Sequence, residues 1–249
     1  MRRRVLLLRA LAVLACAVTP LAGARAEIDT TPPVKVMSFN IRYATAADGE
    51  NAWSKRRALV LETIRTFGPD LLGAQEVLAR PAAFLREGLP AYGFHGVGRD
   101  DGKEAGEFAP VLWRTTRFER VSGGHFWLSE TPEVPGSRGW DAACVRMVSW
   151  VILADRQADG RRFLVANTHF DHVGAEARLA SARLVDARLR ELAKGISVIL
   201  TGDFNCTEDD APYGVLVGKA PRLVDAHRAA HPQRSPLERT GAGLSLIHI

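Results

Sequence analysis

The sequence predicts an α/β protein in which mixed or antiparallel β-sheets are buried under helices, on three observations. First, strand-like and helix-like segments alternate along much of the chain. Second, residues 145–155 and 161–168 flank the turn Gln157-Ala158-Asp159-Gly160, which is typical of an antiparallel hairpin. Third, residues 196–201 form a solidly apolar strand, which suits a sheet covered on both faces. Alternating helices combined with hairpins favour this class over a purely parallel sheet.

The N-terminal half supplies the first run of elements. Residues 34–40 are predicted to form a buried strand. A helix is expected from about residue 54 to 67, because Val60, Ile64 and Phe67 share one face at spacings of four and three. Gly68-Pro69 ends that helix. The next predicted elements are a strand at 70–76, a short helix near 82–86 and a strand at 92–97.

The second half begins with a polar, Gly-rich loop at residues 98–109 and includes a long Pro/Gly loop at 129–141. Long loops in compact domains are more often functional than idle. The clearest helix spans residues 175–192, with Gly195 as its predicted cap. Its apolar stripe is Ala182, Val185, Leu189 and Leu192, and the strands predicted around the two loops are 110–114 and 124–128.

Residues 1–26 are predicted to form a secretory signal peptide. A basic start, Met1-Arg2-Arg3-Arg4, precedes a mostly apolar stretch, and Ala24-Arg25-Ala26 places small residues at the positions that a signal peptidase reads. A membrane anchor is the alternative, but Arg9 and Pro20 interrupt the apolar run below a spanning length. We therefore expect an exported protein, periplasmic or secreted, with one domain over residues 33–249. Cys144 and Cys206 remain as either a disulfide or two thiols.

Charge gives no support for a nucleic-acid partner. The chain carries 33 basic and 28 acidic residues, a formal charge of +5. Five of the arginines lie in the predicted leader, so the rest of the chain has 28 basic and 28 acidic residues. A neutral domain supplies little of the attraction that phosphate backbones need. No later segment is long and apolar enough to span a membrane, and we expect a monomer.

Polar residues end four of the predicted strands. Each cluster alone has a structural explanation, such as a capping Asn or an Asx-turn. Four in equivalent places favour a site, because ligand sites of α/β folds lie at the carboxyl ends of strands. The clusters are Ser38-Phe39-Asn40, Gln75-Glu76, Asn167-Thr168-His169-Phe170-Asp171-His172 and Thr201-Gly202-Asp203-Phe204-Asn205.

The residue types in these clusters limit the chemistry. Two carboxylates, Glu76 and Asp203, together with amide oxygens suit Mg²⁺ or Mn²⁺. Zinc is disfavoured because no His/Cys cluster has ligand spacing. Asn side chains and His169 can donate to the remaining oxygens of a bound phosphate. This set is suited to the in-line attack of water on a phosphoester.

Four motifs together resemble the endonuclease/exonuclease/phosphatase (DNase I-like) superfamily: MSFNIR at 37–42, GAQEV at 73–77, NTHFDH at 167–172 and TGDFN at 201–205. The resemblance covers nearly all of residues 34–225 and extends to a bacterial subgroup of exported metal-dependent hydrolases. It implies a four-layer α/β sandwich, with two mixed sheets face to face and helices outside. It also implies a metal-dependent phosphoric ester hydrolase.

The resemblance carries roles onto particular residues. Glu76 matches the principal Mg²⁺ ligand, and Asn40 matches the residue beside it that helps to hold metal and phosphate. Asp203 matches the carboxylate that orients or deprotonates water, Asn205 its partner on the phosphate, and His169 a donor to the phosphoryl oxygens. Arg146 is a candidate positive clamp or an ordinary salt bridge. His172 and Asp171 are expected near the site without assigned roles, and Glu107 is a weaker candidate.

The sequence departs from the family at its C-terminus. The superfamily ends in a Ser-Asp-His motif on a final strand, and no such motif follows Asp225 here. We therefore expect a truncated reading frame whose domain lacks its last strands. This leaves a second hypothesis beside the exported phosphoesterase, namely an inactive or non-catalytic fragment of such a domain.

The substrate is not fixed by the sequence. A phosphomonoester or phosphodiester of a small metabolite or sugar suits the neutral charge. The alternatives are nuclease action and phospholipase C-like action, although no exposed aromatic hairpin indicates a membrane wedge. Trp127 and Trp140 are candidates for stacking on a base or sugar, but Trp is more often part of a core.

Overall fold

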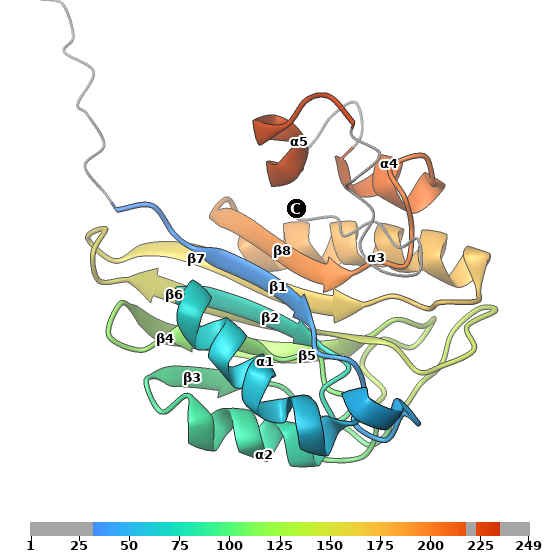
Figure 1. The fold of residues 1–249 in the computed structure, drawn as a ribbon. Coiled ribbons are helices and arrows are strands. Elements are labelled where there is room, and N and C mark those ends of the chain that lie inside the picture. The colour runs from blue at the N-terminus through green and yellow to red at the C-terminus, as the bar shows by residue number, and fades with distance from the viewer. Residues whose placement is uncertain (1–31, 218–222, 235–249) are drawn as a thin grey trace, which may run out of the picture. The chain divides into compact units, whose positions relative to one another are not determined.

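The computed structural model describes residues 32–217 and 223–234, which contain two mixed four-stranded sheets with helices outside them (Figure 1). The predicted α/β sandwich is confirmed. The predicted leader, residues 1–26, and residues 235–249 lie outside the described part of the chain. None of the described helices is long and apolar enough to cross a membrane.

The first sheet has the order β1-β2-β4-β3 and comes from the N-terminal half. β1 and β2 are parallel, whereas β4 pairs antiparallel with both β2 and β3. The helix α1 ends at Gly68, which has a φ of 60° as a left-handed C-cap, as predicted. The elements are β1 (Val36–Asn40), η1 (Gly49–Asn51), α1 (Trp53–Phe67), β2 (Leu71–Gln75), α2 (Ala79–Gly88), β3 (Tyr92–His95) and β4 (Val111–Arg114).

The second sheet has the order β5-β6-β7-β8. The predicted hairpin forms the antiparallel pair β6 and β7, and α3 connects β7 to the parallel strand β8. Lys194, with a φ of 46°, occupies the C-cap of α3, so the cap predicted at Gly195 falls one residue earlier. The elements are β5 (Phe118–Trp127), β6 (Met147–Asp155), β7 (Arg161–His169), α3 (Ala175–Ala193), β8 (Ser197–Asp203), α4 (Ala211–Val217) and α5 (Ala226–Ala230).

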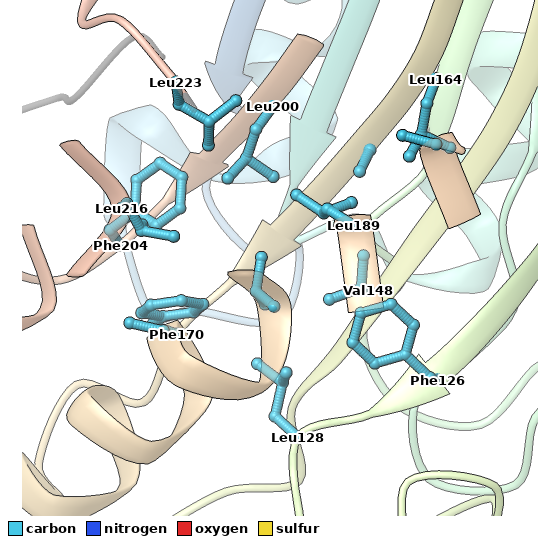
Figure 2. Packing of buried hydrophobic residues seen from close by; sticks show 14 of the residues in the cluster. Phe126, Leu128, Val148, Leu164, Phe170, Leu189, Leu200, Phe204, Leu216 and Leu223 are labelled. Atoms are coloured by element: carbon cyan, nitrogen blue, oxygen red, sulfur yellow. The ribbon is translucent and has the colours of Figure 1, made fainter. Parts of the chain in front are cut away.

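Alternation along the strands creates three apolar layers. In β2, Leu72 packs under α1 and α2, whereas Leu71 faces the other sheet and packs with Val165. A third cluster joins the outer face of the second sheet to α3 and α4 (Figure 2). Its labelled members include Phe126, Val148, Phe170, Leu189 and Phe204. The helices therefore cover the outer faces, and the two sheets pack against each other.

Some elements differ from their predicted extent. β5 begins at Phe118, whereas the sequence predicted a start at residue 124. The first part of the strand was missed because Ser122-Gly123-Gly124 and a register shift after Arg120 interrupt the alternation expected of a strand. α2 is longer than the predicted segment 82–86. The short helices α4 and α5 were not predicted, since neither is long enough to show a periodic stripe.

A polar network replaces apolar packing at one end of the interface between the sheets. The Nε2 of Gln75 donates to the Oδ1 of Asn167 at 2.7 Å, and the hydroxyl of Thr201 donates to the same oxygen at 3.0 Å. Asn167 returns hydrogen bonds to the main-chain oxygens of Ala74 and Pro110. These buried side chains fix the ends of β2, β7 and β8 relative to one another across the two sheets.

Candidate active site at the ends of two parallel strand pairs

The predicted site residues come together where one parallel pair of strands in each sheet ends. In the first sheet, Asn40 is paired in register with Gln75, and Glu76 follows directly. In the second sheet, His169 is paired in register with Asp203. Hydrogen bonds from Asn40 join the two strand ends across the sheets, so four segments separated by up to 163 positions form one site.

Asn40 brings the two carboxylates together. Its Nδ2 donates to Oε1 of Glu76 at 2.7 Å and to Oδ2 of Asp203 at 2.9 Å. Its Oδ1 accepts from the main-chain N of Arg42 at 2.9 Å, which fixes the orientation of the amide. The other oxygen of Glu76 accepts from the main-chain N of Tyr43 at 2.7 Å. Two carboxylates held this close favour a bound cation, because their charges repel.

The backbone is constrained at two of these residues. Glu76 and Asn205 have φ angles of 59° and 47°, a left-handed region that non-glycine residues rarely adopt. Asn205 is held by its main-chain N, which donates to Asp203 at 3.1 Å, and by its Nδ2, which donates to the oxygen of Phe170 at 2.9 Å. Such conformations persist where the surroundings impose them and cluster at functional sites.

Two candidate site residues of the second sheet are each followed by a buried phenylalanine. Phe170 follows His169, and Phe204 follows Asp203. Both rings are fully buried and meet edge to face with centroids 5.1 Å apart (Figure 2). The alternation of polar and aromatic residues therefore places one side chain in the site and the next in the core.

His169 connects the carboxylates to a second charged group. Its Nε2 lies 3.8 Å from Asp203, and its Nδ1 lies 3.7 Å from Glu107. Glu107 accepts from Nη1 of Arg99 at 2.8 Å. Burial disfavours ionisation of Glu107, but His169, Arg99 and Arg146 outweigh it and hold its pKa below the usual value. The weaker candidate Glu107 is thus an ionised neighbour of His169.

Arg146 lies beside the same group and is 5% exposed. Its Nη2 is 3.2 Å from Nδ1 of His172, and its Nη1 is 3.8 Å from Glu107. Burial lowers the pKa of Arg146, and the charge of Arg99 lowers it further. The ordinary surface salt bridge considered for Arg146 does not describe this position, because the guanidinium is buried.

Cys144, Asp171 and His172 form a separate group whose donor atoms lie within 4.8 Å of one another. The Asp171 carboxylate already accepts the main-chain N–H groups of Cys144, Val173 and Gly174. Although burial opposes ionisation, these bonds lower the pKa of Asp171 to about 2. Arg146 lies 3.9 Å from the same carboxylate. Filled acceptors and an adjacent cation disfavour a metal ion here. Both Cys144 and Cys206 are free thiols.

Two contributors to the site escaped the sequence reasoning. Arg99 pairs with Glu107, and its main-chain oxygen accepts from Nε1 of Trp127 at 2.6 Å. The signal was the polar loop at 98–109, which contains both charges but gives no indication of their pairing. Trp127 is buried and fixes this loop, so it is not a stacking surface. The second contributor is the main-chain N of Tyr43, which no side-chain pattern indicates.

The profile of the Endonuclease/Exonuclease/phosphatase family matches residues 37–243, the span that contains every residue of this site. The chain belongs to the endonuclease/exonuclease/phosphatase family. The similar proteins include a probable RNA exonuclease and a mannosyl-6-phosphatase, so membership identifies a phosphoesterase or nuclease fold.

Three relatives show the range of the family. A crystal structure of a family protein from Bacteroides vulgatus is 43% identical with a TM-score of 0.71, over 74% of this chain and 70% of that one. A mannosyl-6-phosphatase from Bacteroides thetaiotaomicron is 39% identical with a TM-score of 0.72, over 75% and 71%. Human nocturnin is 24% identical over 80% of this chain.

The chain spans 49% of human nocturnin and 41% of a probable RNA exonuclease from Saccharomyces cerevisiae, which is 26% identical over 77% of this chain. The activities of those whole proteins therefore do not transfer directly. The structure of the human nocturnin catalytic domain, with a TM-score of 0.69 and 23% identity over 84% of this chain and 78% of that one, supports the fold.

Proposed function

We propose that this chain is an exported hydrolase that cleaves a phosphate ester by metal-assisted attack of water. The observation that carries the proposal is the pair of carboxylates, Glu76 and Asp203, which both accept from Nδ2 of Asn40. The donors present are hard oxygens, which fit Mg²⁺ or Mn²⁺. We assign Glu76 as the principal ligand and Asn40 as the residue that helps to hold metal and phosphate.

The bound ion would supply charge neutralisation for the phosphoryl oxygens. The chain's own residues do the remaining work. Asp203, 7% exposed, orients the attacking water and accepts its proton on the carboxylate. His169 donates to a phosphoryl oxygen as negative charge develops, and Asn205 supports the phosphate from the adjoining loop. Arg146 and His172 are assigned to substrate binding.

The substrate class is proposed from charge and from a relative. The part of the chain after residue 26 has no net charge, which disfavours a nucleic-acid polyanion. The neighbour named as a mannosyl-6-phosphatase supports a small phosphorylated sugar or a similar metabolite. Nuclease and phospholipase C-like activities are the alternatives. We also propose that the enzyme acts as a monomer.

The test compares turnover of a panel of phosphate esters with Mg²⁺ and with EDTA. We expect Glu76→Gln and Asp203→Asn each to lower kcat/KM by at least about 100-fold, because each removes a carboxylate charge from the site. EDTA should abolish turnover and added Mg²⁺ or Mn²⁺ restore it. Asp209→Asn is the matched control, since that carboxylate is exposed and pairs with Arg234.

Near-normal rates in both carboxylate variants would remove the site assignment. No turnover of any ester by the folded wild-type chain would favour the inactive-fragment hypothesis. Circular dichroism spectra and melting curves establish folding in each case.

Export is proposed from the leader pattern at residues 1–26. Expression in a bacterial host followed by mass spectrometry of the periplasmic fraction tests it. We expect a mature N-terminus at Glu27, one residue after the predicted cleavage point. An uncleaved chain retained in the cytoplasm would refute export and leave the catalytic proposal standing.

A further inference from the structure

Arg146 is a buried cation beside the candidate site, and two of its three guanidinium nitrogens make no hydrogen bond within the described part of the chain. Its Nε and Nη1 are both inaccessible to solvent and have no hydrogen-bond partner among residues 32–217 and 223–234. A buried guanidinium with unused N–H groups is costly, since the desolvation of the charge is not repaid. These donors therefore lack an acceptor that a ligand can supply.

Neither neighbouring acid meets this need. Glu107 is 3.8 Å from Arg146 but already accepts from Arg99 at the shorter distance of 2.8 Å. Asp171 is 3.9 Å away and accepts three main-chain N–H groups, those of Cys144, Val173 and Gly174. Both carboxylates thus accept hydrogen bonds from closer donors. The guanidinium of Arg146 can therefore still donate to an anionic ligand.

The space next to Arg146 is small. A cavity of about 10 Å³ lies among side chains of Arg99, Glu107, Arg146 and His169. That is room for about one water molecule or one bare oxygen atom. His169 borders this cavity and also lies 3.8 Å from Asp203, so the cavity adjoins the carboxylate pair. Because the cavity holds only about one oxygen atom, an ester substituent has to remain outside it.

Resting on the proposed function, we infer that Arg146 makes the site selective for phosphomonoesters, by receiving a terminal, unsubstituted phosphoryl oxygen. Two physical effects act in the same direction. A monoester carries close to two negative charges above its second pKa of about 6, whereas a diester carries one. A monoester also has three unsubstituted oxygens and a diester two, so with one oxygen in the cavity a monoester leaves two for His169 and for a cation at the carboxylate pair, whereas a diester leaves one.

The experiment measures kcat/KM with Mg²⁺ for 4-nitrophenyl phosphate and bis(4-nitrophenyl) phosphate. We expect the wild-type chain to prefer the monoester. Arg146→Met should lower monoester kcat/KM by at least about 100-fold and diester kcat/KM by less than about 10-fold. Arg146→Lys retains the charge but has fewer donors, and should recover part of the monoester activity.

Arg156→Met is the matched control. Arg146 directly precedes β6 and Arg156 directly follows it, but Arg156 is exposed and pairs with Glu119 at 3.1 Å. This variant should leave both activities unchanged. Equal losses on the two esters in Arg146→Met and Arg146→Lys, or no loss in either, would overturn the inference.

Binding separates this inference from the proposed function. Titration calorimetry with Mg²⁺ compares inorganic phosphate with dimethyl phosphate. In the wild-type chain, phosphate affinity should rise with pH as phosphate loses its second proton, and this rise should be smaller in Arg146→Met, which lacks one of the positive charges that favour the dianion. Selective phosphate binding without turnover would refute hydrolysis and retain the role of Arg146. Turnover combined with equal binding of the two anions would do the reverse.

Discussion

The glycine at position 73 allows the two sheets to approach closely beside the site. A Cβ added to Gly73 would lie 2.0 Å from Oγ1 of Thr201 and 2.6 Å from Oδ1 of Asn167. Both atoms belong to the buried polar network that links β2 to β7 and β8. Glycine is therefore required here for close approach and not for an unusual φ.

We predict that Gly73→Ala destabilises the protein by about 2–3 kcal/mol, because the added methyl group forces apart two packed sheets. Urea denaturation at a constant m-value measures the change. Gly214→Ala is the control: a Cβ there meets nothing within 4 Å, and the residue lies inside α4. It should be neutral or stabilising by up to about 1 kcal/mol. A Gly73→Ala variant as stable as the wild type would refute this account of the interface.

At the scale of elements, the strand ends were the most predictable feature. Asn40, His169 and Asp203 each end a strand, and Glu76 follows β2 by one position. Solid apolar runs before them identified the strands, and a change to polar residues located the ends. The pairing of those ends could not be predicted, because register depends on contacts between strands far apart in the sequence.

The elements that escaped prediction have weak local signals. The first half of β5 is largely exposed and Gly-containing, so its residues are ordered by pairing with β6 and not by a buried face. α4 and α5 are held by contacts with neighbouring segments: α4 packs on α3, and the Asp225 cap of α5 accepts from Tyr213. Short helices of this kind gain little from their own sequence.

At the scale of the whole molecule, a pair of stacked, partly buried histidines joins an edge strand of one sheet to an edge strand of the other. His95 from β3 and His125 from β5 lie with ring centroids 4.4 Å apart and planes inclined by 13°. Burial lowers the pKa of His125 to about 4, with further lowering by His95 and Arg120. Burial also lowers the pKa of His95. Both rings are therefore neutral at neutral pH.

We predict a loss of stability in mild acid from this pair. Below about pH 6.5 the unfolded chain binds a proton at His125 that the folded chain refuses until about pH 4. The contribution of neutral His125 to the free energy of unfolding is therefore fully present above pH 6.5. It decreases by about 2–3 kcal/mol as the pH falls towards 4. Urea denaturation from pH 7.5 to pH 4.5 measures the slope.

His125→Phe should flatten that slope, because the ring can still stack on His95 but does not titrate. His227→Phe is the control, since that side chain lies on the short helix α5 and outside the interface between the sheets. An unchanged slope in His125→Phe would show that other groups govern the acid sensitivity.

The sequence alone determined the α/β class, the order of the main elements and the residue types of the site. These follow from local patterns: apolar periodicity, glycine and proline stops, and polar residues at strand ends. The family resemblance added the sandwich and the residue roles.

Only the tertiary structure decided that Asn40 joins the two carboxylates, that Arg99 pairs with Glu107, and that Arg146 is buried with unused donors. Hydrogen-bond partners and burial depend on which distant segments meet. The order of residue types along the chain does not specify these hydrogen-bond partners or this burial, because each strand could pair with several others.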